Sequence, residues 1–300
     1  MRESARRQFD LLRKIGAPQI NRALIAQLDA KAEAGQAPAD WNLIKANLAR
    51  RCGDLELART SFRAHLQAIN GDPAADLPRY AATPLGFMSN ATQTIAPVLV
   101  IDDLLPTSQM EQLHRHACSL QPQFRDANTN SQKAEYDPDK RQTLVTWAFE
   151  YRRDFFLQFV KDNLAQFQLS LGLPAFEIDR IEIKMTCHTD GCFFKTHADN
   201  HAAIGEAGRA ISWLYYFGED PPRQKGGELF VLDSDIEGRT HSPTWFTRVE
   251  AKPNRFVAFP SWYHHAVGPT QLPGNQFSDG RFAISSHIRK PADGLDWPAP

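Results

Sequence analysis

The stretch that decides the fold is Phe193-Phe194-Lys195-Thr196-His197-Ala198-Asp199. Its aromatic start predicts a β-strand, and side chains two residues apart on a strand point to the same face. His197 and Asp199 would then share one face and can hold one metal ion between them.

A second His-x-Asp tripeptide, His188-Thr189-Asp190, lies just upstream. It leads directly into Gly191, and Asp-Gly is a favoured pair for the tight turn of a β-hairpin. We therefore interpret this tripeptide as a turn between strands and His197-Ala198-Asp199 as the metal-ligating pair.

Short strand-like segments separated by turn signals continue through the C-terminal part of the chain. They cover residues 177–187, 193–199, 210–217, 227–233, 245–251, 255–260, 264–268 and 281–289. So many short strands in little over a hundred residues favour an antiparallel sandwich or jelly roll over an α/β sheet. The expected class is α+β, with a double-stranded β-helix core, flanking helices and a small N-terminal helical region.

The domain organisation follows from where the periodicity changes. Residues 1–75 are predicted to be helical, and a short part from Gly53 resembles half of a tetratricopeptide repeat. Residues 76–95, rich in turn formers, are predicted to be a linker, and residues 96–300 the β-helix domain. Within that domain, residues 151–171 have the apolar spacing of one long amphipathic helix.

Composition excludes some function classes. The formal net charge is -1, and no long basic run is present, so we expect neither a nucleic acid nor an anionic membrane as a partner. No eighteen consecutive apolar residues occur, and the charged N-terminal segment does not resemble a signal peptide. The expected location is the cytoplasm.

A third candidate ligand lies far downstream, where His265 follows the apolar segment 256–259 and begins the sequence His-Ala-Val-Gly-Pro. His264 would point to the opposite face of a strand, so only one of the two can face the metal. The histidines that lack ligand spacing are predicted to be surface or ordinary core residues: His65, His114, His116, His201, His241 and His287. Two histidines and one carboxylate form the ligand set of non-haem iron(II) oxygenases.

These features together resemble the prolyl-hydroxylase-like branch of the 2-oxoglutarate- and iron(II)-dependent oxygenases. The likeness covers most of residues 96–290 and includes the sequence Gly226-Gly227-Glu228-Leu229. It implies that Fe(II) is bound by His197, Asp199 and His265. It also implies that 2-oxoglutarate is bound by Arg281, at the start of the last strand, and by Tyr216. Arg289 and Lys290 are alternatives to Arg281.

The resemblance implies an O2-dependent dioxygenase that hydroxylates an unactivated C–H bond and releases succinate and CO2. Asp199 is present where related halogenases have a small residue, which favours hydroxylation. We expect a protein or peptide substrate, bound with help from a loop at residues 126–141. A free amino acid or another small metabolite is the alternative substrate, and the N-terminal helices are a candidate surface for a protein partner.

Two readings of another class stay open on the sequence alone. The first is a non-redox barrel of the cupin type, although cupin sites tend to use more histidines and a glutamate. The second is an interaction protein without catalytic activity, whose helical region does the binding.

Overall fold

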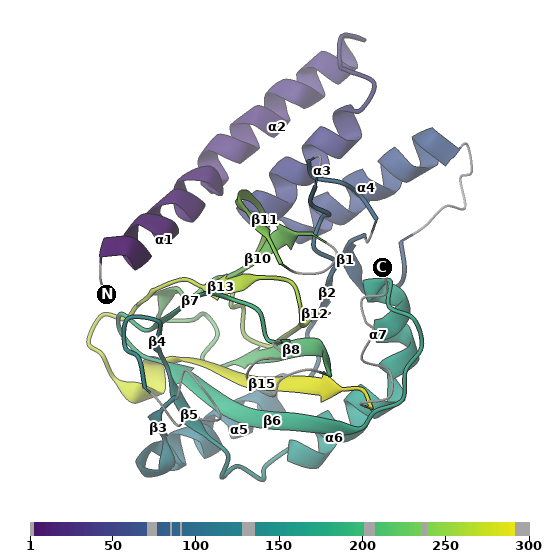
Figure 1. Cartoon of the computed structure of the whole chain (residues 1–300). Coiled ribbons are helices and arrows are strands. Elements are labelled where there is room, and N and C mark those ends of the chain that lie inside the picture. The colour runs from purple at the N-terminus through teal and green to yellow at the C-terminus, as the bar shows by residue number, and fades with distance from the viewer. Residues whose placement is uncertain are drawn as a thin grey trace.

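Two antiparallel β-sheets stack face to face in the computed structural model, and helices cover the outside of both (Figure 1). The structure describes residues 3–70, 77–84, 86–90, 92–127, 136–200, 208–235 and 239–291. The predicted α+β class with a double-stranded β-helix core is confirmed.

The larger sheet has eight strands. In spatial order they are β1 (Ala81–Thr83), β2 (Val98–Asp102), β12 (Arg255–Pro260), β8 (Arg209–Phe217), β15 (Arg281–Arg289), β6 (Arg180–His188), β5 (Leu144–Thr146) and β3 (Arg125–Asp126). Because side chains alternate along each strand, one face of this sheet points into the sandwich and the other toward helices.

The smaller sheet has five strands. Their order is β11 (His241–Val249), β10 (Leu229–Ser234), β13 (His265–Val267), β7 (Phe193–His197) and β4 (Arg141–Gln142), and β14 (Thr270–Gln271) pairs separately with β9 (Lys225–Gly226). Every strand segment predicted from residue 177 onward overlaps one observed strand, whereas the short strands β9 and β14 were not predicted. The chain passes from one sheet to the other as it runs from β6 to β7 and on to β8, which is how a jelly roll is wound.

Seven α-helices are described. They are α1 (Glu3–Ile15), α2 (Pro18–Glu33), α3 (Trp41–Cys52), α4 (Leu55–Asn70), α5 (Thr107–Ser119), α6 (Arg153–Asp162) and α7 (Leu164–Leu171), with 3-10 turns at Gln121–Gln123 and Phe277–Asp279. None of these helices is long and apolar enough to cross a membrane.

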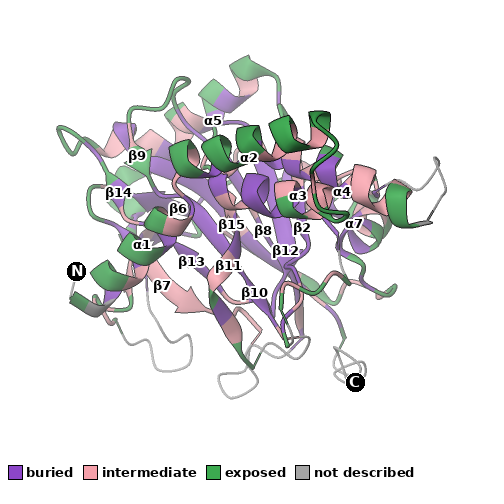
Figure 2. Ribbon diagram, turned by 90° about the horizontal axis from the view of Figure 1, so that it is seen from above, coloured by how far each residue is buried: buried purple, intermediate pink, exposed green. Residues whose placement is uncertain are grey.

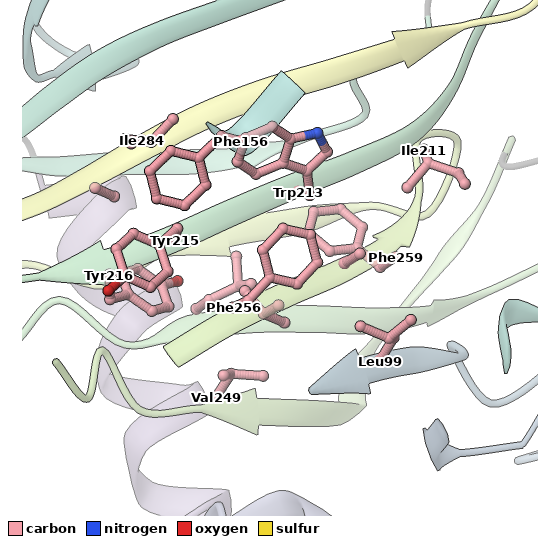
Figure 3. Packing of buried hydrophobic residues seen from close by; sticks show 14 of the residues in the cluster. Leu99, Phe156, Ile211, Trp213, Tyr215, Tyr216, Val249, Phe256, Phe259 and Ile284 are labelled. Atoms are coloured by element: carbon pink, nitrogen blue, oxygen red, sulfur yellow. The ribbon is translucent and has the colours of Figure 1, made fainter. Parts of the chain in front are cut away.

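The main core lies between the eight-stranded sheet and helices α5, α6 and α7. Phe156 of α6 packs against Trp213 and Tyr215 of β8, with ring centroids 6.2 and 4.9 Å apart (Figure 3). Burying an aromatic side chain of this kind stabilises the fold by about 1.5–3 kcal/mol. This core holds the sheet whose other face lines the site described below.

The single helix predicted for residues 151–171 is wrong in one respect, because two helices occupy this range. Asn163 separates α6 from α7, and its side-chain amide donates a hydrogen bond to the Phe159 carbonyl at 2.8 Å. An asparagine competes in this way for backbone groups and favours a helix end. The apolar periodicity continues through the break, so the pattern alone gave no sign of it.

Helices α1 and α3 pack on β11 of the five-stranded sheet, α2 packs on α3, and α4 packs on β1 of the eight-stranded sheet. Ala5, Phe9 and Leu12 of α1 are buried against a cluster that includes Phe230 and Phe246, while the opposite faces of the helices are exposed (Figure 2). A one-sided apolar stripe of this kind is what makes an exposed helix dock on a sheet. The domain boundaries at residues 75 and 95 stay predictions.

A buried ion pair also joins the helices to this sheet. The Arg50 guanidinium of α3 donates two hydrogen bonds to the Asp233 carboxylate of β10, at 2.8 and 2.7 Å, and both side chains are 0% exposed. The Asp233 carboxylate also accepts a hydrogen bond from the Ala96 amide at 3.2 Å. The pair therefore ties three distant segments of the chain together.

Replacing Asp233 by alanine is expected to lower the free energy of unfolding by about 3–5 kcal/mol, because it leaves the Arg50 charge buried without a partner. Urea denaturation followed by circular dichroism measures this loss. Glu219→Ala is the control, since it breaks an exposed pair with Arg223 that contributes at most about 1 kcal/mol. Equal effects of the two substitutions would contradict the assigned role.

Candidate active site

A cavity of about 1150 Å³ lies between the two sheets. The inner faces of β6, β8 and β15 form one wall, and residues of β7 and β13 form the opposite one. The predicted ligands and Arg281 all line this cavity.

The predicted metal ligands come together on the wall formed by the smaller sheet. His197 ends β7 and His265 begins β13, and the two are register partners in the antiparallel pair. The Nε2 atoms of His197 and His265 lie 3.6 and 3.3 Å from the Asp199 carboxylate oxygens. One ligand atom from each of the three residues lies within 4.8 Å of the others.

Both imidazoles are held with Nε2 toward this group. His197 Nδ1 lies 2.8 Å from the Lys195 carbonyl, and His265 Nδ1 lies 3.1 Å from the Tyr263 carbonyl. A carbonyl accepts a hydrogen bond, so each Nδ1 carries the proton and each Nε2 keeps a lone pair. Burial and the neighbouring His197 also lower the pKa of His265 to about 4, which keeps that ring neutral at neutral pH.

These residues fit a divalent metal ion. Ligands that sit about 2.1 Å from an ion at right angles to one another are about 3 Å apart, close to the separations seen here. Neutral nitrogen donors and one carboxylate are the donor set that suits iron(II). Among the described residues, this is the only cluster of three or more potential ligands with such geometry.

Asp199 lies just beyond the end of β7 rather than on the strand, and a polar group fixes its position. Its backbone amide donates to the Ser261 carbonyl at 2.9 Å, and its carboxylate accepts a hydrogen bond from the Ser212 hydroxyl at 2.6 Å. His287 Nδ1 lies 3.6 Å from the same carboxylate. Burial alone would raise the pKa of Asp199, but the imidazoles of His287, His265 and His197 hold it well below its usual range.

His287 and Ser212 are site residues that the sequence interpretation missed. His287 was predicted to be an ordinary core or surface residue, yet its ring contacts the Ser212 hydroxyl at 3.2 Å and lies beside Asp199. Burial lowers the pKa of His287 well below its ordinary value, although the Asp199 carboxylate opposes that shift. The available signal was its position six residues after Arg281 on one strand, which places both side chains on the same face.

Arg281 and Tyr216 lie together at a different part of the large sheet. Ala283 of β15 pairs with Tyr216 of β8, and the Arg281 guanidinium lies 4.6 Å from the centre of the Tyr216 ring. Arg281 is 1% exposed. Its Nε and Nη2 atoms, and the hydroxyl groups of Tyr216 and Thr270, have no hydrogen-bond partner among the described residues.

Orphaned donors in a buried place are costly unless something binds there. A buried guanidinium with two unpaired nitrogens and a nearby tyrosine hydroxyl suits a carboxylate, which accepts two parallel hydrogen bonds from arginine. Burial raises the pKa of Tyr216, although Arg281 opposes that effect, so the hydroxyl stays protonated and can donate. The residues therefore fit one carboxylate of 2-oxoglutarate.

Gly227 makes room for the Arg281 side chain. Its φ of +68° is in the left-handed region, and a Cβ there would lie 2.8 Å from Arg281 Cδ. Glycine satisfies both requirements because it has no Cβ. The Gly-Gly sequence noted above thus has a local structural reason.

The alternatives weighed on the sequence take other positions. His188 ends β6 with Nε2 3.1 Å from the Thr143 hydroxyl, and Asp190-Gly191 forms the predicted turn. The His264 ring packs against His241 at 4.5 Å rather than facing the ligand group. Arg289 pairs with Glu182 at 2.9 Å. Half of the predicted binding loop at residues 126–141, namely residues 128–135, lies outside the described residues, as do 201–207.

The chain is similar in sequence to known oxygenases. Residues 183–289 match the 2OG-Fe(II) oxygenase superfamily. An uncharacterized PKHD-type hydroxylase of a Synechocystis strain is 26% identical over 193 residues, which make up 63% of this chain and 62% of that protein. The match thus spans less than two thirds of the relative's length.

Two solved structures are similar at low sequence identity. One is a prolyl-4-hydroxylase of Pseudomonas putida, with a TM-score of 0.48, 16% identity, and coverage of 65% of this chain and 93% of that one. The other is a prolyl hydroxylase of Trichoplax adhaerens in complex with a hypoxia inducible factor peptide fragment, with a TM-score of 0.49, 17% identity, and coverage of 64% and 83%.

Proposed function

We propose that this protein, whose residues 183–289 match the 2OG-Fe(II) oxygenase superfamily, is a hydroxylase acting on an unactivated C–H bond of an amino-acid residue in a protein or peptide. Its reactants are 2-oxoglutarate and O2, and its by-products are succinate and CO2. The observation that carries the proposal is the group of His197, Asp199 and His265 in one cavity with Arg281, two of whose nitrogens have no hydrogen-bond partner among the described residues.

The five candidate site residues have separate roles in this proposal. His197, Asp199 and His265 would hold iron(II), through two imidazole nitrogens and one carboxylate. Arg281 and Tyr216 hold the carboxylate of 2-oxoglutarate that is remote from the metal. When bound, the iron and 2-oxoglutarate supply the oxidising power that converts C–H to C–OH. The protein orients the reactants.

The size of the cavity and an exposed aromatic residue on its wall favour a peptide substrate. Its volume of about 1150 Å³ exceeds the upper range of about 1,000 Å³ that is usual for small-ligand pockets. Trp147, on its wall, is 61% exposed and offers a flat surface to residues that flank the target. The Synechocystis relative is also named a hydroxylase. A free amino acid or another small metabolite is the alternative substrate.

The function is tested by incubating purified protein with Fe(II), 2-oxoglutarate and O2 and measuring succinate. Production that is lost in His197→Ala and Asp199→Ala supports the oxygenase. A protein that binds no iron and makes no succinate with any candidate peptide would favour the interaction reading. Mass spectrometry of cellular peptides, with and without this protein, identifies the substrate by a gain of one oxygen atom.

Removing the hydroxyl that supports Asp199 is expected to weaken metal binding. In Ser212→Ala the carboxylate loses its 2.6 Å hydrogen bond, and the loss of such a supporting contact typically reduces metal affinity by about 10–100-fold. Isothermal titration with Co(II), as a stable substitute for iron, measures the effect. Ser286→Ala is the matched control, because Ser286 lines the same cavity without a hydrogen bond among the described residues. Equal affinities of the two variants would remove Ser212 from the site.

Two further expectations stay predictions. The N-terminal helices remain a candidate surface for a protein partner, and the cytoplasm remains the expected location.

A further inference from the structure

The large sheet gives the cavity a strongly cationic wall. Alternation along β6 brings Arg180, Glu182 and Lys184 onto the cavity, and β15 adds Arg281 and Arg289. The described lining contains eight lysine and arginine side chains but only two carboxylates. The formal net charge of the whole chain is -1, so this excess is local.

Both carboxylates of the lining are already engaged. Asp199 belongs to the metal group. Glu182 accepts hydrogen bonds from Arg209 at 2.6 and 2.8 Å and from Arg289 at 2.9 Å. Burial alone would raise the pKa of Glu182, but these two arginines hold it below its ordinary value. Glu182 is therefore ionised, and its single negative charge neutralises only one of these two arginines.

The proposed co-substrates account for little of this excess. A divalent metal ion, the Asp199 carboxylate and doubly charged 2-oxoglutarate together carry a net charge of minus one. Arg281 alone balances that charge. Most of the positive charge of the wall therefore remains after iron and 2-oxoglutarate have bound, and it acts on whatever enters next.

Lys184 is the lysine of this wall that is most affected by the excess of positive charge. Its side chain is half-buried in the cavity wall, opposite Ser285 of β15 in the strand register. No described residue forms a hydrogen bond or an ion pair with its ammonium group. Burial and the nearby charges of Arg141 and Arg209 lower its pKa to about 8, so it is still mainly charged at neutral pH. Asp199 opposes that shift, which places the ammonium group within the field of the metal site.

An ammonium group that is withdrawn from water among other cations is unfavourable until an anion pairs with it. We propose that the substrate of this site is anionic and that Lys184 binds a carboxylate of it beside the metal. The inference rests on the proposed function for its chemistry, and it adds the class of the substrate. The carboxylate belongs either to an acidic side chain in a peptide or to a small amino-acid derivative, and both share the same recognition.

The test compares probes that differ only in charge. Two heptapeptide libraries, one with Asp or Glu and one with Asn or Gln at the central position, and the pair N-acetylglutamate and N-acetylglutamine, are titrated into the full chain. The protein is loaded with Fe(II) and 2-oxoglutarate without oxygen. We expect the acidic member to bind at least about tenfold more tightly, with a preference that weakens as salt is added. The two arms show whether the peptide or the small molecule is the source.

The variant Lys184→Met is expected to lose most of that preference, a fall of about 10–100-fold in affinity for the acidic probe, as is usual when a hydrogen bond to a charged group is removed. Lys161→Met, on the exposed side of α6, is the control for the loss of one positive charge. Lys184→Glu should reverse the preference. Thermal denaturation of each variant verifies that it is folded.

Separate titrations with 2-oxoglutarate distinguish a failure of the proposed oxygenase function from a failure of the anionic-substrate inference. A wild-type protein that binds no 2-oxoglutarate would overturn the proposed function. A protein that binds 2-oxoglutarate but takes acidic and neutral probes equally, or neither, would overturn the anionic substrate. A Lys184→Met variant that loses 2-oxoglutarate affinity while keeping the charge preference would assign Lys184 to the co-substrate instead and overturn its role with the substrate.

Discussion

Arg281→Met is expected to weaken 2-oxoglutarate binding by roughly 30-fold to several thousand-fold. This range corresponds to the about 2–5 kcal/mol lost when one partner of a buried, hydrogen-bonded charge pair is truncated. Isothermal titration of 2-oxoglutarate into the metal-loaded protein under nitrogen measures it. The same substitution removes a buried guanidinium with two unpaired nitrogens, so the ligand-free variant should unfold at the same temperature as the wild type or higher.

Arg289→Met is the matched control for Arg281→Met. Both arginines lie on the cavity side of β15, but the guanidinium of Arg289 pairs with Glu182. Its replacement should leave 2-oxoglutarate affinity within a few-fold of the wild type. Addition of 2-oxoglutarate should raise the melting temperature of the wild type and of Arg289→Met, but not that of Arg281→Met. The reverse order would make Arg289 the anchor, as the alternative drawn from the sequence allowed.

His265→Ala is expected to reduce iron affinity by more than about 100-fold, since it removes a ligand and even the loss of a supporting residue costs 10–100-fold. Metal content after dialysis, measured by mass spectrometry, detects this loss. His264→Ala provides a comparison at the neighbouring position, because that ring stacks on His241 and not on the ligand group. His188→Ala should retain iron as well. Iron loss in His188→Ala with retention in His265→Ala would mean that the wrong His-x-Asp pair had been chosen.

Local patterns were sufficient to predict the longer strands from residue 177 onward, but not the short strands β1, β3, β4, β9 and β14. Alternating apolar residues and turn pairs such as Asp190-Gly191 are read over a few residues, and each predicted segment overlaps an observed strand. The division of residues 151–171 was not visible, because Asn163 interrupts the helix by a side-chain hydrogen bond and not by a change of hydrophobicity. The position of Asp199 beyond the strand end likewise depends on its contact with Ser261, far away in the sequence.

The part of the site that could be predicted is the part that depends on residue type and on the spacing of residues along the sequence. His197, Asp199 and His265 were expected to meet, and the structure brings them together; their role as iron ligands, and that of Arg281 and Tyr216 with 2-oxoglutarate, stay predictions. Ser212 and His287 could not be found in the same way, since their contact with Asp199 depends on the register between β8 and β15. The cationic wall could not be predicted, because its lysines and arginines are far apart in the sequence and meet only when the strands pair and place them on one face of the sheet.

The link between Arg50 and Asp233 has a practical consequence for work with shortened chains. A chain that began after the linker would contain every candidate site residue, but it would leave the Asp233 carboxylate without its cation and uncover Phe230 and Phe246. We therefore expect the barrel and its N-terminal helices to unfold together as one unit. Helices α1 and α3 cover one face of the smaller sheet, which also carries His197 and His265.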